Sequence, residues 1–229
     1  MKKIVVLTGA GISAESGIKT FRDADGLWEG HDIMEVATPK GFAKNPELVL
    51  KFYNDRRKQL LTVEPNKAHT NLVALEKFFD IEIITQNVDN LHEKAGSKNV
   101  IHLHGELLKV RSTLDDNFII NWTKDLIIGD LCTKQSQLRP HIVWFGEMVP
   151  MLDKAIKITQ KADILIIIGT SMQVYPAASL INYVQQNTPI YFIDPKPSVS
   201  ENDFKNLTII KNQASSGTDE LIELLLNKL

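Results

Sequence analysis

Short apolar runs alternate with helical patterns along most of the chain. Three of these runs, Ile4–Leu7, Ile81–Thr85 and Asp163–Ile168, resemble strands of a parallel sheet that is buried on both faces. Two further strands are predicted at Pro189–Asp194 and Leu207–Lys211. The alternation predicts an α/β fold: a Rossmann-like parallel sheet with helices on both faces, plus a smaller inserted module.

The segment Asp32–Thr62 is predicted to be helical and inserted, and it contains a helix whose start is marked in the sequence. Asn45 suits the N-cap and Pro46 the first helical position, and the helix runs through ELVLKFYNDRRKQLL. Arg56 falls on the apolar stripe of this helix, whereas Arg57 and Lys58 fall off it. The other members of the stripe are Val49, Phe52, Tyr53 and Leu60.

Two explanations fit an arginine on an apolar stripe. The stem of Arg56 packs while its head pairs with an internal Glu or Asp, which is the more common case for a lone arginine. Alternatively, Tyr53 and Arg56 offer a hydroxyl and a bidentate fork to a carboxylate on a ligand. The periodicity alone does not choose between them.

The remaining helices and the domain boundaries follow from the same patterns. Helices are predicted at Lys67–Phe79 and Pro176–Gln186, and a closing helix is predicted with Thr218 as its cap. His69 is expected to pack or to cap. The chain, 1–229, is predicted to be a single domain. Its large part covers approximately 1–30, 68–105 and 139–229, and its small module approximately 31–67 and 106–138.

The composition is that of an ordinary globular chain. Its 229 residues are 43% hydrophobic and 24% charged, which is enough for a full core. A formal net charge of -2 gives no general attraction to nucleic acid or to an anionic membrane, and no apolar run is long enough to span a bilayer. We therefore expect no nucleic acid or membrane partner, and a cytoplasmic location by default.

The first strand runs directly into a glycine turn. Gly9 and Gly11 are able to take positive φ and to let phosphates come close, so we expect a pyrophosphate site at the start of the following helix. The next glycine, Gly17, comes too late for the G-x-G-x-x-G dinucleotide fingerprint. The residues that follow Gly17 strengthen the expectation of a pyrophosphate site, because they add an aromatic ring, a cation and a carboxylate. These residues are Thr20, Phe21, Arg22 and Asp23.

Polar side chains follow three predicted strands, at the edge where ligands of parallel sheets bind. Amides and a carboxylate after the Ile81–Thr85 strand are suited to a carboxamide and to ribose hydroxyls, whereas Asn90 is explained by turn chemistry. Asp194 ends another strand and is expected to accept hydrogen bonds from a ribose. The other strand-end residues are Gln86, Asn87, Asp89, Gly169, Thr170 and Ser171.

Two histidines alternate with apolar residues in the segment 100–104. His102 and His104 share one face of this strand, and Ile101 and Leu103 share the other. No carboxylate or cysteine at matching spacing completes a metal site, so one structural and one chemical histidine is the favoured interpretation. His104 stands at the strand end, where a neutral imidazole suits a general base near pH 7.

Five motifs occur in order: GAGISAESGIKTFRD, TQNVDN, HLHGEL, RPHIVWFGE and GTSMQVYPAA. Together they resemble the sirtuin family, the NAD-dependent protein lysine deacylases, across nearly the whole chain. The resemblance implies that NAD is consumed as a co-substrate, with His104 as the base and Asn87 positioning a water or hydroxyl. The NAD-binding residues that it implies are Gly9, Ala10, Gly11, Ala14, Glu15, Thr20, Phe21, Arg22, Trp28, Gln86, Asn87, Asp89, His104, Gly169, Thr170, Ser171, Asp194 and Ala214.

The resemblance also implies the substrate. An acylated-lysine protein would pair as an added strand with the segment 143–147, and the products would be free lysine, nicotinamide and O-acyl-ADP-ribose. Tyr53 and Arg56 match the Y-x-x-R pair that receives succinyl and malonyl groups in one branch of the family. The implied peptide contacts are Val143, Trp144, Phe145 and Gly146.

The chain departs from the family pattern between Gly105 and Arg139. Most sirtuins hold zinc there with two C-x-x-C pairs, but this chain has one cysteine, Cys132, so no zinc is expected. We expect an apolar cluster to hold the module instead. Its members would be Ile119, Ile120, Trp122, Leu126, Ile127, Ile128 and Leu131.

Three functions other than deacylation would require some of the same sequence features. A nicotinamide dehydrogenase shares the fold class and a glycine turn, although the glycine spacing argues against it. A module that only binds NAD or ADP-ribose needs no base. A protein ADP-ribosyltransferase differs from the favoured function in where the ribose ends up.

Overall fold

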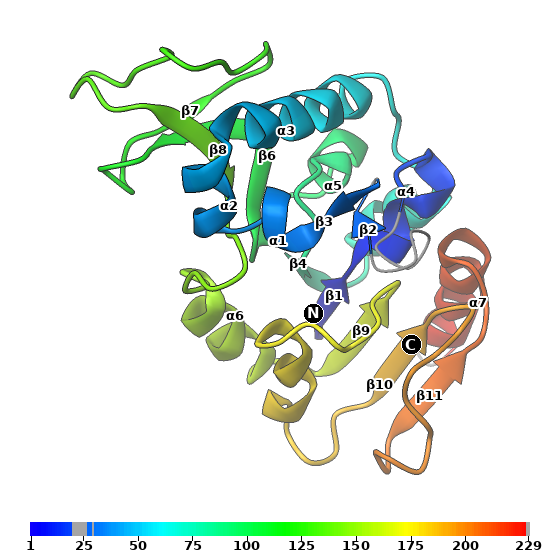
Figure 1. The fold of residues 1–229 in the computed structure, drawn as a ribbon. Coiled ribbons are helices and arrows are strands. Elements are labelled where there is room, and N and C mark those ends of the chain that lie inside the picture. Colours follow the sequence, from blue (N-terminus) through cyan, green and yellow to red (C-terminus); the bar gives the residue numbers. More distant parts are fainter. Residues whose placement is uncertain (20–26, 29, 228–229) are drawn as a thin grey trace.

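A parallel sheet lies at the centre of the computed structural model, which describes residues 1–19, 27–28 and 30–227 (Figure 1). Each neighbouring pair of its strands is parallel, which confirms the predicted Rossmann-like α/β class. In the order in which they pair, the strands are β11 (Leu207–Ile210), β10 (Ile190–Ile193), β9 (Ile164–Ile168), β1 (Lys3–Thr8), β4 (Asp80–Thr85) and β5 (Val100–His102).

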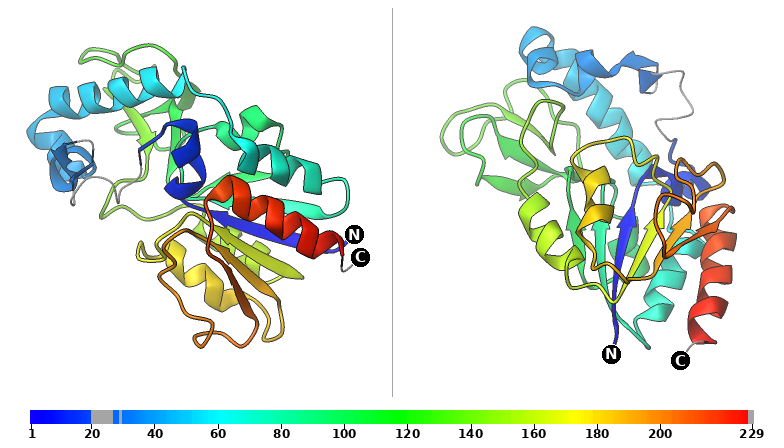
Figure 2. Two further views of the ribbon diagram at one scale, coloured as in Figure 1. Left: turned by 90° about the vertical axis from the view of Figure 1, so that its right-hand side faces the viewer. Right: turned by 90° about the horizontal axis from the view of Figure 1, so that it is seen from below.

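Helices cover both faces of this sheet, because successive side chains of a buried strand point to opposite sides (Figure 2). Ile4 and Val6 belong to one core, and Val5 and Leu7 belong to the core on the opposite face. The first core is covered by α4 (Lys67–Leu75) and α7 (Ala214–Leu226), and the second by α6 (Leu152–Thr159) and the 3₁₀ helix η3 (Ala177–Tyr183). The 3₁₀ helix η1 (Ala10–Ser16) follows β1, and α5 (Leu91–Ala95) follows β4.

A smaller, antiparallel sheet lies beside the large one (Figure 1). Phe52 and Tyr53 share a core with Leu107 and Ile142, which joins the preceding helices to this sheet. The strands pair in the order β7 (Ile119–Asn121), β6 (Gly105–Ser112) and β8 (Leu138–Ile142). The helices are α1 (Ile33–Val36), α2 (Pro39–Lys44) and α3 (Pro46–Leu60), preceded by the hairpin β2 (Leu27–Trp28) and β3 (His31–Asp32).

Helix α3 begins where the sequence predicts it, but the prediction for one of its arginines is wrong. The Asn45 side chain accepts the N–H of Leu48, as an N-cap does. Arg57, expected off the apolar stripe, is only 1% exposed, and its guanidinium donates to the Leu107 carbonyl and to Asn54 Oδ1. Burial lowers its pKa to about 10. The small sheet therefore covers a second face of α3, which a single-stripe pattern does not include.

Two further predictions about the elements are wrong. The closing helix α7 begins at Ala214, and Thr218 lies inside it with its hydroxyl donating to the Ser215 carbonyl, so Thr218 is not the cap. The small module is not held by the predicted apolar cluster, because β7 is an edge strand and most of that cluster faces outward. The exposed members are Ile119, Ile120, Ile127, Ile128 and Leu131.

The core of the small module is formed by a different set of residues. Leu126 is the one predicted member that is fully buried, and it packs with Cys132 and with residues of α3, β6 and β8. The buried residues of this core are Leu50, Val110, Leu126, Cys132 and Leu138. Trp122, a second predicted member, is partly buried and packs against them. No helix in the described ranges combines the length and apolarity that crossing a membrane requires.

Candidate active site

The large sheet reverses its strand order between β1 and β9, and a cavity of about 980 Å³ opens there. The chain passes from β1 to β4 on one side and from β9 to β10 on the other, so the connections diverge from the ends of the two central strands. Such a switch point leaves a crevice at the carboxyl ends of the strands, where α/β proteins bind nucleotides. Gly9, after β1, and Gly169, after β9, both line the cavity.

The predicted site residues that the structure describes all line this one cavity. Thr20, Phe21 and Arg22 lie outside the described residues. The residues found at the cavity are Gly9, Ala10, Gly11, Ala14, Glu15, Trp28, Tyr53, Arg56, Gln86, Asn87, Asp89, His104, Val143, Trp144, Phe145, Gly146, Gly169, Thr170, Ser171, Asp194 and Ala214.

The glycine turn works by close approach of backbones and not by positive φ. Gly9 has φ of -124°, which contradicts the expected positive value, and Gly11 is not among the glycines with positive φ. The Gly11 N–H donates to the Gly169 carbonyl at 2.8 Å, and a Cβ on Gly11 would lie 2.6 Å from the Gly169 Cα. The floor of the cavity is therefore backbone without Cβ atoms, which fits an extended group such as a pyrophosphate.

Ser13 links the helix after this turn to the end of β4. Asn87 donates its amide N–H to Ser13 Oγ at 3.2 Å, and Ser13 donates its hydroxyl to Asp89 Oδ2 at 3.0 Å. The other Asp89 oxygen accepts the Leu91 N–H, and burial raises the pKa of this carboxyl. Ser13 is not among the predicted site residues, since its only signal in the sequence is its position inside the glycine motif. Its hydroxyl fixes the orientation of Asn87 and Asp89.

The ends of the other strands are also tied together. Gln86 Nε2 donates to Thr170 Oγ1 at 3.0 Å, which connects the end of β4 to that of β9. Asp194 is buried at the end of β10, and its Oδ1 accepts the Lys196 N–H. Glu15 accepts the N–H of Ser215 in the first turn of α7. Four elements thus contribute polar groups to a single crevice.

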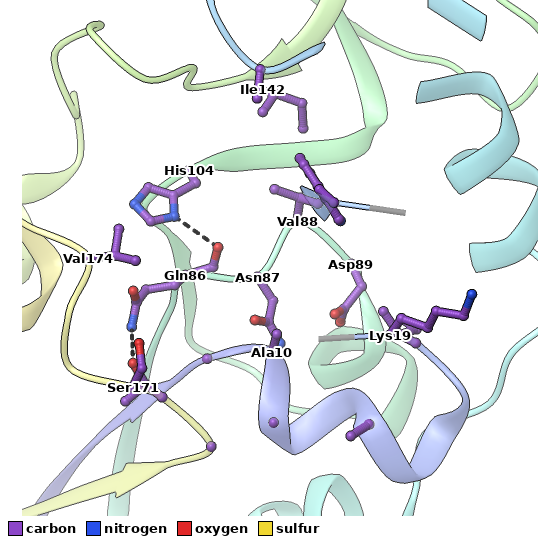
Figure 3. A pocket seen from close by; sticks show the side chains of 18 of the residues that line it. Ala10, Lys19, Gln86, Asn87, Val88, Asp89, His104, Ile142, Ser171 and Val174 are labelled. Carbon is purple, nitrogen blue, oxygen red and sulfur yellow. Dashed lines mark hydrogen bonds between the residues drawn. The ribbon is translucent and has the colours of Figure 1, made fainter. Parts of the chain in front are cut away.

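His104 has its hydrogen-bonding pattern set by a main-chain carbonyl. Its Nδ1 lies 3.0 Å from the main-chain oxygen of Gln86. Figure 3 marks this hydrogen bond, and because a carbonyl only accepts, Nδ1 carries the proton. The lone pair is therefore on Nε2, in a side chain that lines the cavity. Burial lowers the pKa of His104, so the ring is neutral at pH 7. This arrangement suits a general base.

His102, on the same face of the strand, has both ring nitrogens occupied. Nδ1 lies 2.9 Å from the Asn87 carbonyl, and Nε2 lies 2.8 Å from Glu93 Oε1. Burial opposes the charged form, but the hydrogen bond and negative charge of Glu93, together with the Asn87 carbonyl and the charge of Glu106, raise the pKa of His102. Its contacts are those of a structural residue. His69 likewise forms a capping box with Asn66 at the start of α4, as expected.

Tyr53 and Arg56 project from α3 to the same cavity. The Tyr53 hydroxyl oxygen accepts the indole N–H of Trp144 at 2.9 Å. The Arg56 guanidinium carbon lies 3.8 Å from the centre of the Phe52 ring, and one of its nitrogens donates to the Phe52 carbonyl. The α3 backbone and the Phe52 ring therefore hold the cation beside the phenol at the wall of the cavity.

The segment proposed to pair with a peptide is already tied to the protein through its N–H groups. Those of Val143 and Phe145 donate to the carbonyls of His104 and Ala37, and that of Trp144 donates to Glu147 Oε2. The Trp144 carbonyl is also occupied, since it accepts the Glu147 N–H.

Cys132 lies among hydroxyl groups in the small module. Its sulfur is 3.1 Å from Ser136 Oγ and 3.5 Å from Ser112 Oγ, and it accepts the Lys134 N–H. Hydrogen bonds, chiefly that of Ser136, lower the pKa of this thiol to about 7. Across residues 1–19, 27–28 and 30–227, no three His, Cys, Asp or Glu side chains are grouped so as to hold a metal ion.

A parallel sheet with a glycine-floored crevice at its switch point and a neutral histidine at the rim defines an α/β enzyme that uses a nucleotide. The chain belongs to the Sir2 family, whose model matches residues 9–176, and this confirms the resemblance to sirtuins.

Relatives and solved structures agree with this assignment. The "NAD-dependent protein deacylase" of Helicobacter pylori (strain ATCC 700392 / 26695) is 65% identical over 196 residues, which cover 86% of each chain. That of Bacteroides thetaiotaomicron is 52% identical over 233 residues, 99% of each chain. A Sir2 homologue solved as an NAD complex has a TM-score of 0.88 and 44% identity over 99% of this chain and 90% of its own. A Sir2 protein bound to acetylated peptide has a TM-score of 0.78 and 29% identity over 96% and 92%.

Proposed function

We propose that this protein is an NAD-dependent protein deacylase that removes acyl groups from lysine side chains, and that its acyl pocket accepts succinyl and malonyl as well as acetyl. The enzyme class is supported by the relatives that carry this name over most of the chain. NAD is supported as the co-substrate by the related Sir2 complex and by the glycine floor of the cavity.

The observation that carries the proposal is the state of His104. Its Nδ1 is held by the Gln86 carbonyl, its pKa is lowered by burial, and its ring lines the cavity. Bound NAD would supply the cleavable bond between nicotinamide and ribose, with nicotinamide as the leaving group. His104 Nε2 would accept the proton of the ribose hydroxyl to which the acyl group passes from the lysine. Asn87, oriented by Ser13, positions that hydroxyl or a water.

The acyl preference rests on the pair Tyr53 and Arg56. A carboxylate at the end of a succinyl or malonyl group would accept hydrogen bonds from the Tyr53 hydroxyl and the Arg56 guanidinium, both of which reach the cavity. Both side chains come from α3, one helical turn apart, so their separation is fixed by the helix. An acetyl group lacks the carboxylate and gains nothing from the pair.

A panel of lysine peptides tests the whole proposal. Acetyl, malonyl, succinyl and glutaryl peptides are incubated with NAD, and the products are weighed by mass spectrometry. We expect free lysine peptide, nicotinamide and O-acyl-ADP-ribose from the acetyl, malonyl and succinyl peptides, and none of these products from the His104→Ala variant.

Other outcomes would favour the alternative functions. Tight NAD binding without nicotinamide release would favour a binding module. ADP-ribose attached to the peptide or to another protein would favour a transferase, and hydride transfer without NAD cleavage a dehydrogenase.

A further inference from the structure

The side chain of Trp144 is held by contacts that peptide pairing does not require. It is 2% exposed, although it lies in the segment between β8 and α6 that lines the cavity. Its indole N–H donates to the Tyr53 hydroxyl, and the Arg139 guanidinium carbon lies 3.4 Å from the centre of the Trp144 ring. The Phe42 ring packs against it at 5.2 Å between centroids. The indole therefore has one fixed orientation.

Glu147 holds both the main chain and the cation that fix this ring. Its two oxygens accept a bidentate pair of hydrogen bonds from Arg139, at 2.6 and 3.0 Å, and Oε2 also accepts the Trp144 N–H at 2.8 Å. Arg111 adds a further ion pair from β6 at 3.1 Å. Burial opposes ionisation of Glu147, but the hydrogen bonds from Arg139 and the Trp144 main chain, together with the charges of Arg139 and Arg111, lower its pKa.

The direction of the Trp144–Tyr53 hydrogen bond determines what the phenol does. An indole N–H only donates, so the Tyr53 oxygen accepts, and the phenol proton is directed elsewhere. Within the described part of the chain, no residue accepts that proton in a hydrogen bond. Burial raises the pKa of Tyr53, so the phenol remains protonated. Its hydroxyl is consequently a donor available to a ligand in the cavity.

We propose that Trp144 is a positioning residue for acyl specificity: by occupying the acceptor side of the Tyr53 hydroxyl, it commits this hydroxyl to donate to the carboxylate of an acidic acyl group. Arg139 and Glu147 hold the indole in the orientation that this requires. The role rests on the proposed function of Tyr53 and Arg56 in binding that carboxylate. It extends the specificity site from two residues on α3 to a network that reaches the small sheet.

Steady-state kinetics of Trp144→Phe test the role. The phenyl ring keeps the stacking surface for Arg139 but lacks the N–H, so KM for a succinyl-lysine peptide should rise about tenfold, with kcat changed less than about twofold. KM for the matching acetyl peptide should rise by a much smaller factor. Trp122→Phe is the matched control, since its indole N–H donates to the Asp125 carbonyl in the small module. Equal rises in KM for both peptides would overturn the positioning role.

A double-mutant cycle and one NMR signal separate this role from general damage. In a Tyr53→Phe background, Trp144→Phe should add no further loss on succinyl peptide, whereas additive losses would contradict the inference. The indole ¹H–¹⁵N signal of Trp144 should shift in Tyr53→Phe while that of Trp122 stays in place, and an unmoved Trp144 signal would refute the hydrogen bond. Wild-type protein inactive on succinyl-lysine would overturn the acidic-acyl function and the role together. If the wild type is active on succinyl-lysine but Trp144→Phe impairs the succinyl and acetyl reactions equally, the positioning role alone would be overturned.

Discussion

At the scale of single residues, surroundings decide the chemistry of two histidines on the same strand face. His102 meets a carboxylate, Glu93, and a carbonyl, so its charged form is favoured despite burial. Among the described residues, the His104 ring forms a hydrogen bond with the Gln86 carbonyl and has no carboxylate partner, so burial dominates and its pKa falls. The first is suited to holding the strand end in place, and the second to accepting a proton at neutral pH.

The pH dependence of the reaction should therefore follow His104. Because its pKa lies below the usual 6.5, kcat/KM should stay level as the pH falls through 7 and decline only at lower pH, when Nε2 becomes protonated. The profile with an acetyl-lysine peptide measures this, and His104→Ala should abolish turnover. His102→Gln should retain the same acid limb. An acid limb above pH 7 in wild type would contradict the assignment of His104 as a buried, neutral base.

Arg56 should separate acyl types from one another. Arg56→Met keeps the stem but removes the cation, so kcat/KM for succinyl-lysine should fall by about a hundredfold, and that for acetyl-lysine by less than about threefold. Lys58→Met is the matched control, because Lys58 is a cation of the same helix that pairs with the exposed Asp125. Similar losses on both peptides would remove the basis for an acidic-acyl preference.

At the scale of elements, the large sheet was predictable and the small module was not. The strands β1 and β9 are buried on both faces, so their sequences are nearly continuous apolar runs that the hydrophobic pattern detects directly. The small module is held by polar contacts as well as apolar ones: Arg57 donates to Leu107, and Cys132 lies between two serines. The hydrophobic periodicity of the sequence does not reveal such polar contacts.

Some residues of the candidate site were predictable from the sequence, and others were not. Polar residues at strand ends, such as Gln86 and Asp194, were predictable because parallel strands bring their carboxyl ends to one edge. Ser13 was not, because its importance lies in two hydrogen bonds to residues distant in the sequence. The role of Trp144 was hidden for the same reason, since its partner Tyr53 lies on another element.

The turn between β1 and η1 should tolerate no side chain at Gly11. A Cβ there would lie 2.6 Å from the Gly169 Cα and 2.8 Å from its oxygen, so Gly11→Ala must separate the ends of β1 and β9. We expect a loss of about 1–3 kcal/mol in the free energy of unfolding and at least about tenfold weaker NAD binding. Urea unfolding and titration calorimetry measure these two quantities.

The control for Gly11→Ala is a glycine away from the cavity. Gly96 has φ of +109°, and in the described part of the chain the nearest atom to a Cβ added there lies at 3.8 Å, so Gly96→Ala should cost stability through backbone strain. NAD affinity of Gly96→Ala should equal that of wild type. If Gly11→Ala bound NAD with full affinity, the close contact between the two turns would not matter for the cofactor.

At the scale of the whole molecule, segments that are distant in the sequence meet at one crevice. Two buried histidines should make the free energy of unfolding depend on pH. The rings of His69 on α4 and His92 on α5 lie 5.0 Å apart, and His92 Nε2 lies 3.0 Å from Thr8 Oγ1 at the end of β1. Both side chains are fully or almost fully buried. Burial lowers the pKa of His69 to about 4 and holds that of His92 well below its usual value.

This pair should make the protein lose stability in acid. Between pH 6.5 and about 4, the unfolded chain binds a proton at His69 that the folded chain does not bind. The free energy of unfolding therefore falls as the pH is lowered through this window. His69 alone should contribute a loss of roughly 3 kcal/mol by pH 4, and His92 acts in the same direction. Urea unfolding at pH 7.0, 5.5 and 4.5 measures the slope. His69→Gln, whose amide is able to accept the Asn66 N–H that His69 accepts now, should show a clearly shallower dependence. An unchanged slope would mean that His69 is not held neutral by the fold.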